Sequence, residues 1–209
     1  MSFAQSVLAF ALFAAVLTVT PGLDTLLVLR TSAVAGRRAG FAAGLGIGLG
    51  CVCWAAASAL GITAVLTASR LAFDVLRWAG AAYLCWLGIR LLWRRPAPEQ
   101  STVDLPAVTS PARAFRVGLT TNLLNPKVGV FYLSVLPQFL PDGVAPLLSA
   151  TVLAVVHVGE GLLWFALIIL AVGRAAHLLA RPPVQAWLDR ATGVILIALG
   201  VRLAAELRR

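Results

Sequence analysis

Residues 123–131 read Leu-Leu-Asn-Pro-Lys-Val-Gly-Val-Phe, an apolar run that holds Lys127, the only lysine of the chain. Lysine and arginine together number 17, so every other basic residue is arginine. Pro126 removes a backbone donor, breaks the helical hydrogen-bond ladder and disfavours helical geometry at Asn125. Because an ionisable side chain at membrane depth is costly, its presence there indicates a functional site. The stretch therefore predicts a broken membrane helix with an ammonium group at the break.

The composition of the chain supports that interpretation. Of its 209 residues 60% are hydrophobic and only 12% are charged, whereas about a quarter are charged in soluble domains. The formal net charge is +9, but the arginines stand singly or in pairs at the ends of apolar runs. Such residues border a membrane, and no basic face with interleaved aromatics indicates nucleic acid. We therefore predict an all-α integral membrane protein that does not bind nucleic acid.

Six apolar segments follow one another along the chain, at 3–29, 39–67, 73–93, 117–140, 144–173 and 185–207. A membrane span needs about 20 residues, which the first, second and fifth segments supply. The third and sixth have shorter charge-free cores, 78–89 and 191–201, and continue past Arg90 and Arg202, which can snorkel to the interface. For these two segments a re-entrant or surface helix remains an alternative.

The two halves of the chain resemble each other. The third and sixth segments share Arg-x-x-Gly and Leu-Gly-x-Arg, ending at Arg90 and Arg202, and a proline interrupts the first and fourth segments at Pro21 and Pro126. We predict one transporter domain, 1–209, made of two three-helix repeats, 1–93 and 117–209, joined by an irregular, proline-rich loop, 94–116. An odd number of helices per repeat inverts the second copy, and inverted repeats with broken helices are typical of transporters.

Arginine placement predicts the orientation in the membrane. One side carries the larger group: Arg30, Arg37, Arg38, Arg90, Arg94, Arg95, Arg113, Arg116, Arg174, Arg181 and Arg190. The other side carries Arg70, Arg77, Arg202, Arg208 and Arg209. Because basic residues favour the cytoplasmic side, both termini are expected outside.

The first helix break, at Pro21 and Gly22, frees backbone carbonyls that hydrocarbon cannot satisfy. Asp24 follows within a turn. One hypothesis is a broken helix that lines a substrate cavity, with Asp24 binding an ammonium group or a proton. The alternative is a kinked helix in which Asp24 pairs with Arg30.

The second break supplies Asn125, Pro126 and Lys127. Asn125 is expected to cap the resumed helix or to face the cavity. Lys127 is expected to bind a substrate carboxylate or to pair with Asp24, and we favour a pair that opens when substrate arrives.

His157 and Glu160 stand three apart on the fifth helix, hence on one face. A role in proton coupling or substrate binding, structural hydrogen bonding, and metal ligation are the alternatives. Cys51, Cys53 and Cys85 are expected to be small buried hydrophobes, since an odd number in apolar segments argues against a disulfide framework. The glycines at 40, 44 and 48, four apart, indicate close helix packing.

The motifs together resemble the lysine exporter (LysE/RhtB) family of bacterial amino-acid efflux carriers. The resemblance covers nearly the whole chain and rests on motifs that keep the family's order: Thr20-Pro21-Gly22-Leu23-Asp24, Gly36-Arg37-Arg38-Ala39-Gly40, Ala79-Gly80-Ala81-Ala82-Tyr83-Leu84 with Leu87-Gly88, Phe115-Arg116-x-Gly118, Asn122-Leu123-Leu124-Asn125-Pro126-Lys127 and Leu136-Pro137-Gln138-Phe139. Leu23 departs from the family, which usually has a second proline there.

The resemblance implies a secondary transporter of the bacterial inner membrane that exports amino acids or their derivatives by proton antiport. It would be no enzyme, with no cofactor and no metal, and its partners would be the substrate, protons and the lipid bilayer. The glycine face could serve a homodimer as well as an internal contact. Substrate would lie near Pro21, Gly22, Asp24, Asn125, Pro126 and Lys127. The alternatives are a heavy-metal or cation exporter and a membrane thiol-redox conduit of a related helical fold.

Overall fold

The computed structural model describes residues 2–20, 22–68, 70–93, 110–141, 143–171 and 182–206. All regular elements within these ranges are helical. The α-helices are α1 (Phe3–Val19), α2 (Leu23–Ala35), α3 (Arg37–Ala68), α4 (Arg70–Trp93), α5 (Pro111–Leu123), α6 (Pro126–Val130), α7 (Pro146–Leu170) and α9 (Pro182–Glu206). A π-helical turn, η1 (Phe131–Val135), and a 3-10 turn, η2 (Leu136–Phe139), continue α6. The predicted all-α class is confirmed.

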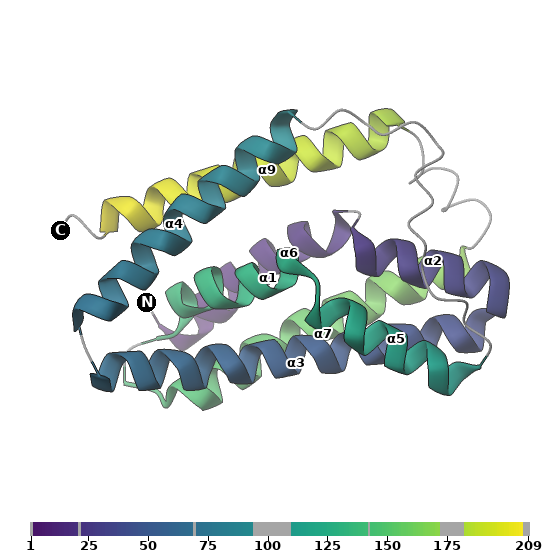
Figure 1. Cartoon of the computed structure of the whole chain (residues 1–209), viewed down its shortest axis with the longest axis horizontal. Coiled ribbons are helices and arrows are strands. Elements are labelled where there is room, and N and C mark those ends of the chain that lie inside the picture. Colours follow the sequence, from purple (N-terminus) through teal and green to yellow (C-terminus); the bar gives the residue numbers. More distant parts are fainter. Residues whose placement is uncertain are drawn as a thin grey trace.

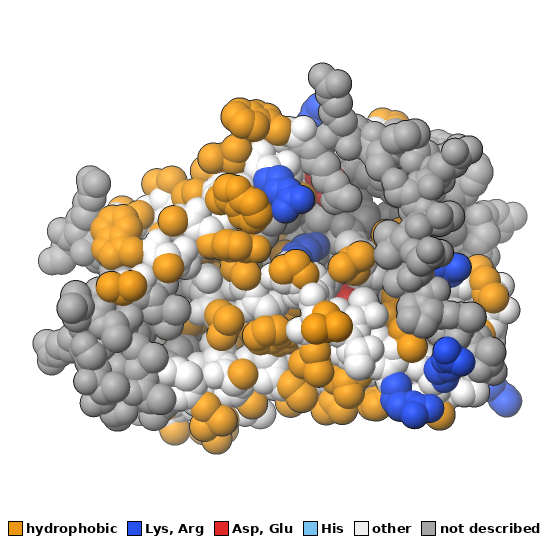
Figure 2. Space-filling model, viewed as in Figure 1, with side chains coloured by type: hydrophobic (Ala, Val, Ile, Leu, Met, Phe, Trp, Pro, Cys, Tyr) orange, Lys and Arg blue, Asp and Glu red, His pale blue; other side chains and the backbone are white. Residues whose placement is uncertain are grey.

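Several helices have the length and composition of membrane spans. Among the described residues, Arg37–Gly61 of α3 and the whole of α7 are long and apolar enough to cross a bilayer. The pair α1 and α2, bent by 54°, qualifies as a third if it forms one span. These helices coincide with the first, second and fifth apolar segments, and Figure 2 shows hydrophobic side chains spread over the visible face.

The first helix is broken where the sequence predicts it. Thr20 and Gly22 both have extended backbones, with φ/ψ of −71°/117° and −153°/−171°, and α2 begins at Leu23. The Thr20 hydroxyl donates to the Val16 carbonyl (2.7 Å), which reduces the number of open acceptors at the end of α1. Leu23 replaces the family's second proline without closing the break; Pro21 itself lies outside the described residues.

The second break also falls at the predicted proline. Asn125 has an extended backbone (φ −80°, ψ 107°), and its side-chain oxygen accepts the Lys127 backbone N–H at 3.1 Å. The predicted cap of the resumed helix is confirmed, since Asn is a favoured N-cap residue. The π-helical and 3-10 turns after α6 were not predicted, and the Ser58 hydroxyl of α3 donates to the Tyr132 carbonyl within the π-helical turn (2.8 Å).

The prediction of an irregular loop through residue 116 is wrong for residues 111–116, which form the first turns of α5. Ser110 accepts the Arg113 backbone N–H (3.3 Å), and Pro111 occupies the first helical turn. Proline there loses no hydrogen bond, because the first N–H groups of a helix have no intrahelical partner. Residues 94–109 of the predicted loop lie outside the described part.

Helix α3 packs against α2, α5 and α7 along its length (Figure 1). A Cβ at Gly46 would overlap the Phe115 carbonyl oxygen, and one at Gly118 would overlap the Ala43 carbonyl oxygen, so α3 and α5 touch backbone to backbone. On another face, Cβ atoms at Gly44 and Gly48 would meet Phe165 and Val158 of α7 at 3.2 and 3.1 Å. The packing role predicted for Gly44 and Gly48 is confirmed at the contact with α7, and Gly46 adds a contact with α5 that was not predicted.

Helices α4 and α9 form a second, antiparallel pair beside this group (Figure 1). Their closest approach is reciprocal, since a Cβ on Gly88 would lie 2.6 Å from the Gly193 carbonyl oxygen and a Cβ on Gly193 would lie 2.7 Å from that of Gly88. Farther along, a Cβ on Gly200 would meet the Ala81 carbonyl oxygen at 2.8 Å. The third and sixth apolar segments, which share sequence motifs, therefore meet through the glycines of those motifs.

Candidate transport site

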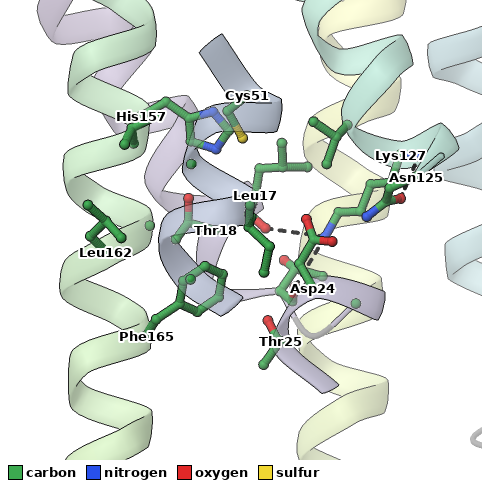
Figure 3. Close-up of a pocket in the computed structure, with 18 residues that line it drawn as sticks. Leu17, Thr18, Asp24, Thr25, Cys51, Asn125, Lys127, His157, Leu162 and Phe165 are labelled. Atoms are coloured by element: carbon green, nitrogen blue, oxygen red, sulfur yellow. Dashed lines mark hydrogen bonds between the residues drawn. The ribbon is translucent and has the colours of Figure 1, made fainter. Parts of the chain in front are cut away.

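A cavity lies beside the two helix breaks. Its free space is about 580 Å³, counting the part that opens outward. The break residues Gly22, Asp24, Asn125 and Lys127 line one end, and α3 and α7 supply most of the remaining wall. In Figure 3, the rings of His157 and Phe165 extend from α7 toward the side that holds Lys127 and Asp24.

Lys127 points from α6 to the end of α1. Its Nζ donates to the Leu17 carbonyl (3.2 Å) and to the Thr20 carbonyl (3.1 Å), as Figure 3 shows for Leu17. A Cβ at Gly22 would lie 3.7 Å from the same nitrogen, so the chain passes close to it. The carboxyl end of a helix carries partial negative charge. The ammonium group thus stabilises the carbonyls that the first break leaves open.

Asp24 occupies the first turn of α2, where the partial positive charge of the helix favours a carboxylate. Its Oδ2 accepts a hydrogen bond from Asn122 Nδ2 at 2.8 Å. Its Oδ1 is buried and has no hydrogen-bond partner within the described residues, and the same holds for Thr18 Oγ1 at the end of α1. The cavity wall therefore contains acceptor atoms that the described protein leaves open.

Asn122 is a functional candidate that the sequence analysis did not single out. It is fully buried on α5 and also donates to Cys51 Sγ (3.5 Å), while its backbone carbonyl accepts from Trp54 Nε1 (3.3 Å). Gly50 makes room for it, because a Cβ there would overlap the amide. The signal in the sequence was a carboxamide three residues before Asn125, within the apolar segment 117–140.

His157 is buried in the cavity wall and shares a hydrogen bond with the Tyr132 hydroxyl (Nδ1 to OH, 2.8 Å). The ring of Phe131 meets the imidazole edge to face, with centroids 5.2 Å apart. Tyr132, in the π-helical turn, thus orients His157. No signal in the sequence paired these two residues, because the contact depends on that turn.

Glu160 is only partly buried, does not line the cavity, and has one carboxylate oxygen without a partner in the described chain. The structure therefore gives His157 and Glu160 different surroundings although they share a helix. Pro126 begins α6 with its side chain exposed, outside the cavity wall, and Pro21 lies outside the described residues. Five predicted site residues thus line one cavity: Gly22, Asp24, Asn125, Lys127 and His157.

The cysteines do not form a reactive pair. Cys51 is buried and lines the cavity, but the prediction of burial is wrong for Cys53, which is exposed on α3. Positions two apart on a helix do not share a face. Within the described ranges, no group of three or more His, Cys, Asp or Glu side chains is placed to hold a metal ion.

Comparisons with known proteins identify the family. Residues 15–207 match the model of the LysE type translocator family. The chain is 35% identical over 189 residues to an uncharacterized membrane protein of Pseudomonas aeruginosa (88% of each chain). It is 28% identical over 205 residues to an uncharacterized membrane protein of Bacillus subtilis (95% of this chain, 98% of the relative).

A functionally named relative is the threonine efflux protein of Escherichia coli K12, which is 29% identical over 195 residues, covering 88% of this chain and 90% of the relative. No solved structure matches the chain. Members of this family are membrane transporters rather than enzymes. Because the family match spans nearly the whole sequence, the chain belongs to the LysE type translocator family.

Proposed function

We propose that this protein is a secondary transporter that exports amino acids or their derivatives across the bacterial inner membrane by proton antiport. The observation that carries the proposal is the cavity between the two helix breaks, with an ammonium group and a carboxylate in its wall. The threonine efflux relative supports the same substrate class.

The two charged groups complement a zwitterion. Lys127 stands at the carboxyl end of α1 and Asp24 at the amino end of α2, so each is stabilised by the nearest helix end. A substrate carboxylate would draw the Lys127 ammonium from the α1 carbonyls, and a substrate ammonium would bind the open Asp24 Oδ1 and Thr18 Oγ1. Pairing of Lys127 with Asp24 in the substrate-free carrier remains our working hypothesis.

Proton coupling requires a titratable group that reaches the transport pathway. Asp24 and His157 line the cavity, and imidazole is the side chain whose ordinary pKa lies near neutrality. Glu160 is a less direct candidate, because it stands outside the cavity wall. We propose that Asp24 exchanges its proton for the substrate ammonium, with His157 in the same aqueous path.

The architecture we propose is a carrier of six spans in two inverted repeats, working by alternating access. The helix breaks at equivalent places and the reciprocal contact of Gly88 with Gly193 support this arrangement. The exposed arginines at the α2–α3 turn and at the start of α5 support a cytoplasmic position for that end, with both termini outside. Basic side chains are visible there in Figure 2.

Counterflow in proteoliposomes tests the function. Purified protein is reconstituted with unlabelled amino acids inside, and entry of each labelled amino acid is measured with and without a pH gradient. Exchange of at least one amino acid, accelerated by the gradient, is expected. If no amino acid or derivative exchanges, the exporter assignment is wrong.

Asp24→Asn separates binding from coupling. The amide preserves the shape and can still accept from Asn122, but it cannot carry a proton. Equilibrium exchange should persist at a reduced rate, while accumulation driven by the pH gradient should vanish. Undiminished gradient-driven accumulation would exclude Asp24 as the coupling residue.

A further inference from the structure

The part of the cavity wall formed by α7 differs from the end that holds Lys127 and Asp24. Val158, Leu162 and Phe165 of α7 line it, together with Ile47 of α3. In Figure 3 the Phe165 ring extends from α7 toward Asp24. Among the described residues, Asp24 and Lys127 supply the only Asp, Glu, Lys or Arg side chains of the lining. His157 is the only polar side chain that α7 contributes to the lining, so a charged substrate side chain directed at Leu162 and Phe165 would lose water without gaining a partner there, which is costly.

Gly161 marks the free space on this side. It lies four residues from both His157 and Phe165 on α7, and the three residues form one stripe along the cavity. A Cβ added at Gly161 would meet no atom within 4 Å. The glycine therefore leaves a notch in α7, bounded by an imidazole ring on one side and a phenyl ring on the other.

The other glycines of the cavity wall leave no such space. A Cβ at Gly44 would lie 3.2 Å from the Phe165 ring, one at Gly48 would lie 3.1 Å from Val158, and one at Gly22 would lie 3.7 Å from Lys127 Nζ. At the first two of these glycines α3 packs closely on Phe165 and Val158, so no side chain could be added there without displacing a neighbour. The size of the notch thus depends on residue 161.

We propose that Gly161 determines which substrates are accepted, and that the substrate is a zwitterionic amino acid with an uncharged aliphatic side chain that occupies the notch. This inference rests on the proposed function and names its substrate class. The polar atoms at the helix breaks bind the α-ammonium and α-carboxylate groups, which all amino acids share. The notch then selects by the size and polarity of the remaining group.

The test is a counterflow series with labelled alanine, valine, leucine, lysine and glutamate, using the wild-type protein, Gly161→Ala and Gly161→Val. The wild type should exchange the three aliphatic amino acids and neither charged one. Gly161→Val should lower leucine exchange relative to alanine by about tenfold or more, as expected when methyl-sized space is lost from an apolar pocket. The ratio of leucine to alanine exchange of Gly161→Ala should lie between the ratios of the wild type and of Gly161→Val.

The matched control is Gly159→Val. Gly159 lies on the same helix, is exposed, does not line the cavity, and a Cβ there also meets no atom within 4 Å. This variant should keep the wild-type ratio of leucine to alanine. If Gly161→Val cannot be purified, Gly161→Ala decides the question through the same ratio, since it adds one methyl group.

Two results would overturn the inference. One is an unchanged leucine-to-alanine ratio in the Gly161 variants; the other is exchange of lysine or glutamate as fast as leucine. Failure of the proposed function is a different result, since the wild type would then exchange no amino acid at all.

Discussion

At the residue scale, the site pairs each charge with a helix end of opposite partial charge. The Lys127 ammonium binds carbonyls at the carboxyl end of α1, and Asp24 stands in the first turn of α2. Such placement is worth about 0.3–1 kcal/mol per charge at an exposed helix end and up to about 2 kcal/mol in partly buried sites. It lowers the cost of holding two charges beside an apolar cavity.

Lys127→Arg should impair transport although the charge is kept. An ammonium group fits between the Leu17 and Thr20 carbonyls, 3.2 and 3.1 Å away, whereas guanidinium is larger and planar. Loss of a hydrogen bond to a charged group costs about 1.5–3 kcal/mol, so counterflow should slow by about tenfold or more. Full activity of this variant would contradict a specific role for the ammonium group.

Replacing Cys51 and Cys53 with serine should leave transport largely intact. A serine hydroxyl at position 51 can still accept from Asn122 Nδ2, and the exposed Cys53 makes no contact with the cavity wall. Counterflow within about threefold of the wild type is expected, since hydroxyl for thiol at a buried position costs about 1 kcal/mol or less when it is hydrogen-bonded. Loss of transport would instead favour the metal-exporter or thiol-redox alternatives.

At the element scale, the sequence predicts where the helices break, but it does not predict which distant side chains form hydrogen bonds around the breaks. Pro21 and Pro126 act locally, because proline removes an N–H wherever it stands, so the sequence alone located both breaks. The Tyr132–His157 bond requires the π-helical turn, and the Asp24–Asn122 bond joins residues 98 positions apart. Such contacts depend on how distant helices pack, which residue spacing does not encode.

Gly46→Ala and Gly118→Ala should destabilise the protein, because each added methyl group would overlap a backbone carbonyl across the α3–α5 contact. Overpacking of this kind costs about 1–3 kcal/mol. Thermal unfolding in detergent should show a clearly lower midpoint for both variants. Gly61→Ala, on α3 where a Cβ meets no atom within 4 Å, is the control and should match the wild type; equal midpoints for all three would refute direct backbone contact.

At the scale of the whole molecule, orientation is the property most open to test. Gly36, with φ of 85°, makes the turn between α2 and α3 beside Arg37 and Arg38, while α1 begins at the opposite end of the molecule (Figure 1). We expect the arginine-bearing end in the cytoplasm.

The two ends can be located with single cysteines in a variant that lacks the native cysteines. Val34, which is 77% exposed, and Ser2, which is also exposed, are suitable positions. A membrane-impermeant maleimide should label Ser2→Cys in intact cells and Val34→Cys only after the membrane is opened. The reverse pattern would place both termini inside.

The bond between Asp24 and Asn122 also has a consequence for biosynthesis. Asp24 leaves the ribosome 98 residues before Asn122, a delay of about 5–20 s at about 5–20 residues per second. Trp54 and Ser58 likewise bind carbonyls 68 and 74 residues later in the chain. During that interval the first helices must be held by the insertion machinery or the lipid with these groups unpaired, and the cavity is complete only when the second half arrives.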